Sequence, residues 1–196
     1  MRPRLGTLDL LLVRHAEAPF GHDDARGLTD AGRRAAEELA DELEPFHVSA
    51  VYSSPYRRAI ETVEPLARRR GLRVLELVDM RERLLSPAPL DDWQGELAKS
   101  FDDPDYAADG GETGRAAQRR AMATLDLLRV RHPDGGRLLV ASHGNLIALI
   151  LQALEPAVGF DFHQAMPNPA IYHLEHDGIG WRVMGGHGFA QAAVQN

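Results

Sequence analysis

Two histidines each lie at the end of an apolar run, with one polar residue between the run and the histidine. His15 comes after residues 10–14, and His143 comes after residues 138–142. Such runs are typical of buried strands, and ligands of open α/β sheets bind outside the carboxyl ends of parallel strands. Arg14 precedes His15, and its guanidinium offers a planar fork of donors for phosphate and disfavours a proton on the neighbouring imidazole. We therefore expect both imidazoles to face one anionic ligand.

A third cationic candidate lies where another predicted strand passes into a helix. Residues 53–59 read Ser-Ser-Pro-Tyr-Arg-Arg-Ala, and the proline suits a first helical turn. Arg57 or Arg58 would then point at the same strand-end crevice as the histidines. Arginines at such positions are usually solvated, so this stretch alone is weak evidence for a site.

Strands and helices are predicted to alternate along the chain. The expected strands are residues 9–14, 48–53, 72–78 and 137–142, with a terminal hairpin of 170–175 and 181–184. The expected helices begin near Thr29, with Ala31, Ala35, Leu39 and Leu43 on one buried face, and cover 55–70, 115–132 and 145–154. Pro65 should kink or restart its helix. This order predicts a three-layer α/β fold: a mostly parallel sheet with helices on both faces and a terminal antiparallel hairpin.

One domain is expected over residues 1–196, with a lid-like insertion at about 84–114. Residues 86–114 hold eight acidic side chains and the aromatics Trp93, Phe101 and Tyr106. A segment of this length is either a functional lid or a solvated insertion with a short helix. As a lid, its carboxylates would repel polyanionic substrates, and its aromatics would pack on an uncharged leaving group.

Composition narrows the partners. The net charge of -7 argues against nucleic acid or an anionic membrane surface, since both need a broad basic face. The chain has no cysteine, which excludes disulfides and thiolate metal sites and fits a cytoplasmic protein. No segment is long enough to cross a bilayer. The oligomeric state stays open.

Taken together, the pairs Arg14-His15 and Ser142-His143, with residues 53–59 between them, resemble the histidine phosphatase superfamily, also called phosphoglycerate-mutase-like. The resemblance covers nearly the whole chain. It extends to residues 27–32, Gly-Leu-Thr-Asp-Ala-Gly, which are similar to a Leu-Thr-x-x-Gly helix entry, and to residues 110–113, Gly-Gly-Glu-Thr. One departure is Ala16, where the family commonly has glycine.

The resemblance implies roles for these residues. His15 would attack phosphorus in line and form a phosphohistidine. Arg14, Arg58 and His143 would hold the phosphoryl oxygens and stabilise the charge of the transition state, so that no metal or other cofactor is needed. The side chain of Asn145, or the backbone amides of Gly144 and Asn145 at a helix amino terminus, would add donors.

A leaving alkoxide also needs a proton. Glu82 matches the acidic position that many members have after the third strand, which makes it the candidate general acid. The alternative is a surface carboxylate paired with Arg81 or Arg83. Glu112 and Asp79 are the next candidates for the acid.

We expect a phosphatase that acts on a small phosphorylated metabolite. Residues 17–20, Glu-Ala-Pro-Phe, do not match the Arg-His-Gly-Glu-Ser-x-x-Asn opening that is characteristic of mutases. Mutase-type phosphoryl transfer and a non-catalytic phospho-ligand binding module stay open as alternatives. A kinase or nucleotide hydrolase is disfavoured, because the chain has no Gly-x-x-x-x-Gly-Lys loop.

Overall fold

The computed structural model of this protein describes residues 6–21 and 24–189, so parts of the predicted domain, residues 1–5, 22–23 and 190–196, lie outside the described residues. The strands are β1 (Leu8–Arg14), β2 (Ala50–Ser53), β3 (Val74–Glu76), β4 (Gly136–Ser142), β5 (Ala170–His176) and β6 (Trp181–Gly186). The helices are α1 (Asp30–Leu43), α2 (Arg57–Arg69), α3 (Trp93–Asp102), α4 (Gly114–Arg131), α5 (Gly144–Leu154) and α6 (Phe160–Ala165). A 3-10 turn at Val78–Met80 follows β3.

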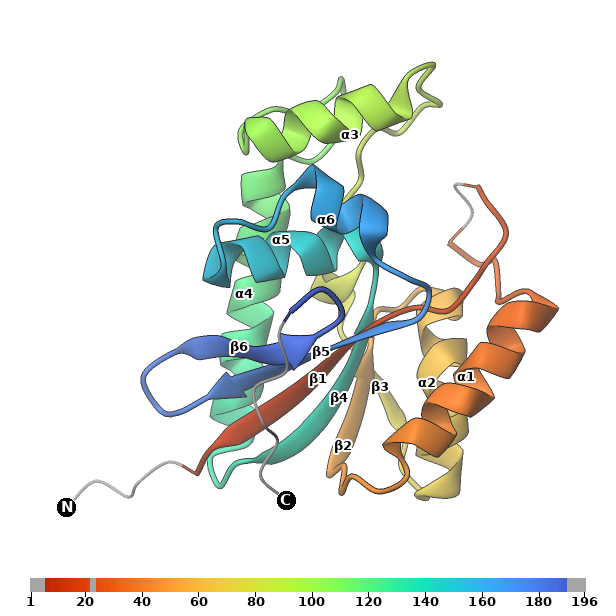
Figure 1. Cartoon of the computed structure of the whole chain (residues 1–196), viewed down its shortest axis with the longest axis vertical. Coiled ribbons are helices and arrows are strands. Elements are labelled where there is room, and N and C mark those ends of the chain that lie inside the picture. Colours follow the sequence, from red (N-terminus) through yellow and green to blue (C-terminus); the bar gives the residue numbers. More distant parts are fainter. Residues whose placement is uncertain (1–5, 22–23, 190–196) are drawn as a thin grey trace.

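The described strands form one sheet in the order β3-β2-β4-β1-β5-β6 (Figure 1). The first four in this order run parallel to one another, because helices connect them across the faces of the sheet. β5 runs antiparallel to β1, and β6 runs antiparallel to β5. The predicted mostly parallel sheet with a terminal antiparallel hairpin is confirmed.

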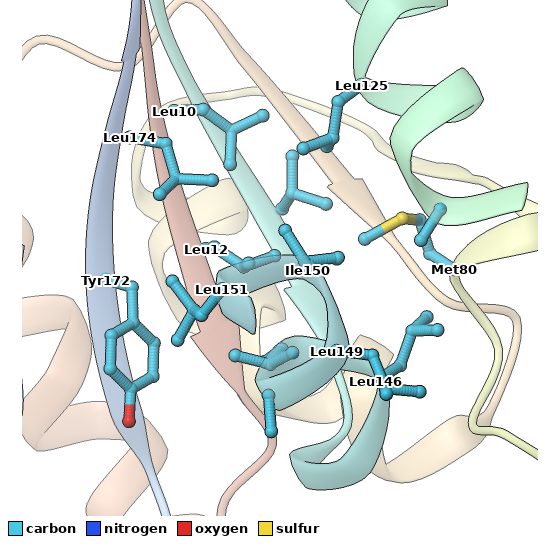
Figure 2. Packing of buried hydrophobic residues seen from close by; sticks show 14 of the residues in the cluster. Leu10, Leu12, Met80, Leu125, Leu146, Leu149, Ile150, Leu151, Tyr172 and Leu174 are labelled. Carbon is cyan, nitrogen blue, oxygen red and sulfur yellow. The ribbon is translucent and has the colours of Figure 1, made fainter. Parts of the chain in front are cut away.

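Helices cover both faces of this sheet. On one face, Leu11 and Val13 of β1 pack in a core with α1 and α2. On the other face, Leu10 and Leu12 pack with α4 and α5, where Leu125 and Ile150 join them (Figure 2). Successive residues of a strand point to opposite faces, so one continuous apolar run supplies both cores. The predicted three layers are confirmed.

The register of the strands brings the two histidines together. Arg14 of β1 lies opposite Ser142 of β4, so His15 and His143 leave the sheet side by side. The His15 amide donates to the Ser142 carbonyl at 3.0 Å. β2 is in register as well, and the Ser54 amide donates to the Ala141 carbonyl at 2.8 Å. All three sequence motifs therefore meet at one edge of the sheet.

The entry of α1 is built around a close backbone approach. The Thr29 hydroxyl accepts the Gly32 amide at 3.0 Å and caps the helix. A Cβ atom at Gly32 would lie 2.1 Å from the Glu17 carbonyl oxygen. The Leu-Thr-x-x-Gly segment thus lets α1 pack directly against the loop that follows His15.

Four details differ from what the sequence predicts. α2 continues through Pro65, which is buried on the core side of the helix, so it does not restart there. β3 covers only Val74–Glu76 of the predicted 72–78, because the chain turns into the 3-10 helix. In α1, Leu39 and Leu43 are buried as predicted, but Ala31 is exposed, and Ala36 and Ala40 complete the buried stripe. Helix α6 was not predicted, since six residues are too few to show a helical period.

None of the helices in the described ranges combines the length and the apolarity that crossing a bilayer requires.

Candidate active site

The contacts of His15 define which ring nitrogen is free to react. Its Nδ1 lies 2.7 Å from the Ala16 carbonyl oxygen, which can only accept, so Nδ1 carries the proton. The Nε2 lone pair then accepts the Nε–H of Arg58 at 3.3 Å. The side-chain amide of Asn168 donates to the His15 carbonyl at 3.0 Å and holds the backbone. His15 therefore presents Nε2 as a nucleophilic atom.

Burial lowers the pKa of His15, and the positive charges of Arg58 and Arg14 lower it further. The bond from Nδ1 to Ala16 opposes this effect, yet the pKa falls to about 3. The imidazole is therefore neutral at every pH well above 3. A neutral ring is the form that can attack phosphorus.

We predict that His15 does not gain a proton between pH 8 and pH 5. An unperturbed histidine takes up its proton around pH 6.5, but the lowered pKa moves this uptake below the range. Nitrogen-15 NMR of the ligand-free protein, with the signal assigned by loss in His15→Asn, should show constant ring shifts. A midpoint near pH 6.5 for this signal would contradict the assignment of a buried, neutral ring.

Two arginines lie against this imidazole. Arg14 donates from Nη1 to the Met166 carbonyl, and its guanidinium packs on Gly144, where an added Cβ would lie 2.9 Å from Nε. Arg58 is 4% exposed, and its guanidinium carbon lies 4.8 Å from the Tyr56 ring centroid. Arg14 Nε and Arg58 Nη1 are buried and have no partner among the described residues. Both guanidinium groups therefore keep N–H donors for an anion.

His143 adds a third unpaired nitrogen. Its Nε2 lies 2.7 Å from the Ser54 hydroxyl, which accepts the Tyr56 amide and has its own proton to donate. In the tautomer with the proton on Nδ1, Nε2 accepts this hydroxyl. Nδ1 is buried without a partner in the described part of the chain. Burial first, and then the charge of Arg58, lower the pKa of His143 well below its usual value. The two imidazoles lie 5.2 Å apart, centroid to centroid.

Glu82 lies at the amino terminus of α5. Its carboxylate accepts the backbone amides of Leu146 at 3.0 Å, Asn145 at 3.3 Å and Arg83 at 2.9 Å. The alternative prediction is a surface carboxylate paired with the side chain of Arg81 or Arg83. The contacts of the described residues include no such pair, so this alternative is wrong. Helix amino termini favour negative charge, which explains this position.

The other residues predicted near the α5 terminus have different surroundings. The amide of Asn145 is used by Glu82, so it is not available to a substrate. The Asn145 side chain is 7% exposed, and both its polar atoms lack a partner among the described residues. Gly144 has no Cβ, which leaves room for the Arg14 guanidinium. The side chain of Asn145 is thus the better placed donor.

The next candidates for the acid lie elsewhere. Both oxygens of Glu112 accept from Arg120, at 2.7 and 2.8 Å. Asp79 pairs with Arg81 at 3.1 Å on the surface. Neither carboxylate lines the cleft beside the histidines.

That cleft has a volume of about 340 Å³. Arg58 and Glu82 line it, whereas His15 and His143 do not. Arg58 also contacts His15, so the cleft lies next to the imidazole across this side chain. Arg26, Asp24 and Tyr56 line it too, although sequence reasoning did not select them. Tyr56 lies inside the 53–59 motif, so the sequence did contain a signal for its position in the site. Arg26 lies two residues before the Leu-Thr-x-x-Gly segment, in a loop without any periodic pattern.

A larger cleft, about 580 Å³, lies between α1 and the β5-β6 hairpin, away from His15 and His143.

The insertion at 84–114 contributes one side of the cleft through Ser86, Ala88, Pro89, Leu90 and Trp93, together with Leu84 and Leu85. None of its eight acidic residues lines the cleft, so the predicted ring of carboxylates is wrong. Of the three aromatics, Phe101 is buried against Phe160 and Tyr106 donates to Glu96, which leaves Trp93. The insertion is docked on the body by α3, whose Leu97 and Phe101 enter the main core.

Known proteins resemble this chain in sequence and in fold. The family model described as the histidine phosphatase superfamily, branch 1, matches residues 10–185. Phosphoglycerate mutase-like protein 4 of Arabidopsis thaliana is 31% identical over 172 residues, which cover 76% of this chain and 72% of that protein. Phosphoserine phosphatase 1 of Hydrogenobacter thermophilus is 27% identical over 148 residues, covering 68% and 70% of the two chains. Among solved structures, a mycobacterial hydrolase shares the fold with a TM-score of 0.78 at 24% identity, covering 94% of this chain and all of that one (100%).

Proposed function

Because the chain belongs to the histidine phosphatase superfamily, we propose that it is a metal-independent phosphatase that hydrolyses a small phosphomonoester through a phosphohistidine at His15. One observation carries the proposal. Around the unprotonated Nε2 of His15, three residues keep buried side-chain nitrogens without partners among the described residues: Arg14, Arg58 and His143. Unpaired buried donors are costly, and a phosphoryl group would satisfy all three.

In the first step the Nε2 lone pair of His15 attacks phosphorus, and the bond from phosphorus to the ester oxygen breaks. The departing oxygen takes a proton from the carboxylic acid form of Glu82, so an alcohol leaves and the Glu82 carboxylate remains. Arg14, Arg58 and the Nδ1–H of His143 hold the equatorial oxygens as charge spreads over them. The neutral state of His15 means that no proton must first be removed from the nucleophile.

In the second step a water molecule attacks phosphorus and gives its proton to the Glu82 carboxylate. The bond from phosphorus to Nε2 breaks, which restores neutral His15 and releases inorganic phosphate. Each step is an in-line displacement held by the same donors, so one set of residues serves both.

A small phosphomonoester is favoured for two reasons. A cleft of about 340 Å³ is at the lower end of the range for small-molecule sites. The name of the relative from Hydrogenobacter thermophilus, a phosphoserine phosphatase, is that of an enzyme with such a substrate. The absence of the mutase opening after His15 favours water over a second substrate hydroxyl as the acceptor.

We predict that hydrolysis of para-nitrophenyl phosphate persists in EDTA at a rate within about two-fold of the untreated rate. The guanidinium groups and His143 take the place of a metal clamp. Colorimetric assays before and after dialysis against the chelator check this. Complete loss of activity that a divalent ion restores would overturn the metal-independent mechanism.

The mutase alternative is tested on the same protein with phosphoglycerate. Phosphorus-31 NMR should show inorganic phosphate as the product. Interconversion of two phosphoglycerate isomers, without release of phosphate, would instead show transfer between hydroxyl groups. A protein that binds phosphate, does neither and also leaves para-nitrophenyl phosphate intact would be a binding module.

A further inference from the structure

Arg120, near the amino end of α4, directs its donors at the backbone around Glu82. Its Nη1 donates to the carbonyl of Asp79 and, at 2.9 Å, to the carbonyl of Arg81. Its Nη2 makes a longer contact, 3.5 Å, with the Glu82 carbonyl. The Arg120 side chain is only 11% exposed. Three carbonyls of the loop that follows β3 therefore converge on one largely buried guanidinium.

Glu112 fixes the plane of this guanidinium. Its two carboxylate oxygens accept from Nε and Nη2 of Arg120 at 2.7 and 2.8 Å, which is the fork geometry of an arginine–carboxylate pair. Burial alone would raise the pKa of Glu112, but the hydrogen bonds and the charge of Arg120 hold it below its usual value. Glu112 is itself anchored, because its amide donates to the Leu84 carbonyl at 2.7 Å. The pair stays charged at neutral pH and leaves Nη1 for the loop.

The loop needs these contacts to present Glu82 to α5. Ser142 of β4 holds its start, because the Ser142 hydroxyl donates to the Met80 carbonyl at 2.8 Å. Beyond Met80, no donor among the described residues other than Arg120 reaches the carbonyls of Arg81 and Glu82. Arg120 is thus the side chain that fixes this part of the backbone, from which the Glu82 carboxylate reaches the amides of α5.

Arg120 is too far from the reacting atoms to act on them directly. It does not line the cleft beside Glu82. Burial and the charge of Arg58 lower the pKa of His143 more than the charge of Arg120 does. All three nitrogens of its guanidinium are used within the protein, so none is kept for a phosphoryl group. Any effect of Arg120 on the reaction must therefore pass through Glu82.

We infer that Arg120 is a positioning residue for Glu82: its fork on Glu112 and its carbonyl contacts hold the loop from which Glu82 gives its proton to the leaving oxygen. This inference rests on the proposed function, because Glu82 is the acid of that reaction. A residue that holds the acid affects poor leaving groups, which need the proton, far more than good ones. An arginine that only stabilises the fold affects both alike.

The test compares ethyl phosphate with para-nitrophenyl phosphate. Arg120→Lys keeps the charge, but a single ammonium cannot satisfy both Glu112 oxygens and the loop carbonyls. For ethyl phosphate, kcat should fall about 10- to 100-fold, since a displacement of about 1 Å can cost about 10²-fold; for para-nitrophenyl phosphate it should fall less than about 3-fold. In a Glu82→Gln background the same substitution should no longer act selectively on ethyl phosphate, because the acid is already gone.

Arg129→Lys is the matched control, because Arg129 is also a buried arginine of α4 that donates to backbone carbonyls. It is 6% exposed, and its Nη1 donates to the His132 carbonyl at 2.6 Å. It lies about 13 Å further along the helix, at the end away from Glu82. Its loss should lower stability but leave the ratio of alkyl to aryl rates unchanged. If Arg120→Lys does not fold, Glu112→Gln, which weakens the fork, should show a smaller loss that is again selective for ethyl phosphate.

A second measurement does not depend on turnover. In the ligand-free protein, the amide proton signals of Asn145 and Leu146 should shift in Arg120→Lys in the direction seen for Glu82→Gln, and stay in place in Arg129→Lys. Equal losses for the two esters, no loss for either, or unchanged amide signals would overturn the inference. If the native protein hydrolyses neither ester, the proposed function fails, and the amide signals still decide whether Arg120 holds Glu82.

Discussion

Replacement of His15 by alanine should reduce turnover of any phosphate monoester by about 10⁴-fold or more, the scale on which removal of a covalent nucleophile acts. The structure offers no substitute among the described residues at the same place. The Nε2 of His143 is already held by the Ser54 hydroxyl at 2.7 Å. The loss should appear in kcat, because the phosphoryl-binding donors of Arg14, Arg58 and His143 stay in place.

The covalent intermediate makes this prediction specific. When the native protein turns over a phosphorus-radiolabelled ester and is quenched in base, label should remain on His15, because a phosphorus–nitrogen bond survives alkali. The same label should be lost in acid. His15→Ala and His15→Asn should bind phosphate yet carry no label.

A matched control is His173→Ala. His173 contacts Asp9 at 2.9 Å in the sheet, far from the α5 terminus, so its loss leaves the reacting atoms unchanged. Label on serine, an acid-stable bond, or no label after rapid quench of an active enzyme would defeat the nucleophilic role of His15. None of these results would change the assignment of the fold.

The fold could be predicted because its two strongest signals are local. The first signal is that each apolar run is separated from a histidine by a single residue. The second is the alternation of strands and helices, which predicts the connections between parallel strands. The register of β1 and β4, which pairs Arg14 with Ser142, then brings the histidines together. The same reasoning places Arg58, because a helix that starts at the carboxyl end of β2 begins at the same edge.

Other features depend on contacts that no local pattern records. Arg83 was considered only as a surface partner of Glu82, yet it is buried and binds two carbonyls and a hydroxyl of the insertion. Arg26 reaches the cleft from a loop whose path is determined by tertiary packing. The acidic count of the insertion predicted a charged entrance, but composition does not say which way side chains point. Most of these carboxylates face solvent or neighbouring basic and amide groups instead.

Glu82→Gln should slow alkyl phosphates by about 10² to 10⁴-fold, the usual contribution of a general acid, and aryl phosphates much less. An aryl oxide leaves without a proton, whereas an alkoxide does not. Glutamine keeps the size of the side chain and one oxygen that can accept the amides of Leu146 and Asn145. Rates for ethyl phosphate and para-nitrophenyl phosphate, measured side by side, report the difference.

Asp24→Asn separates Glu82 from the other carboxylate that lines the cleft. Because Asp24 interacts with Tyr56 and not with the amides of α5 that hold Glu82, its loss should leave the ratio of alkyl to aryl rates unchanged. The free energy of unfolding of both variants, from urea titration, shows whether the α5 terminus has been disturbed. An equal loss for both substrates in Glu82→Gln would assign Glu82 a structural role at the helix terminus. A selective loss for alkyl phosphates in Asp24→Asn would instead make Asp24 the acid, since only a proton donor affects the poor leaving group more than the good one.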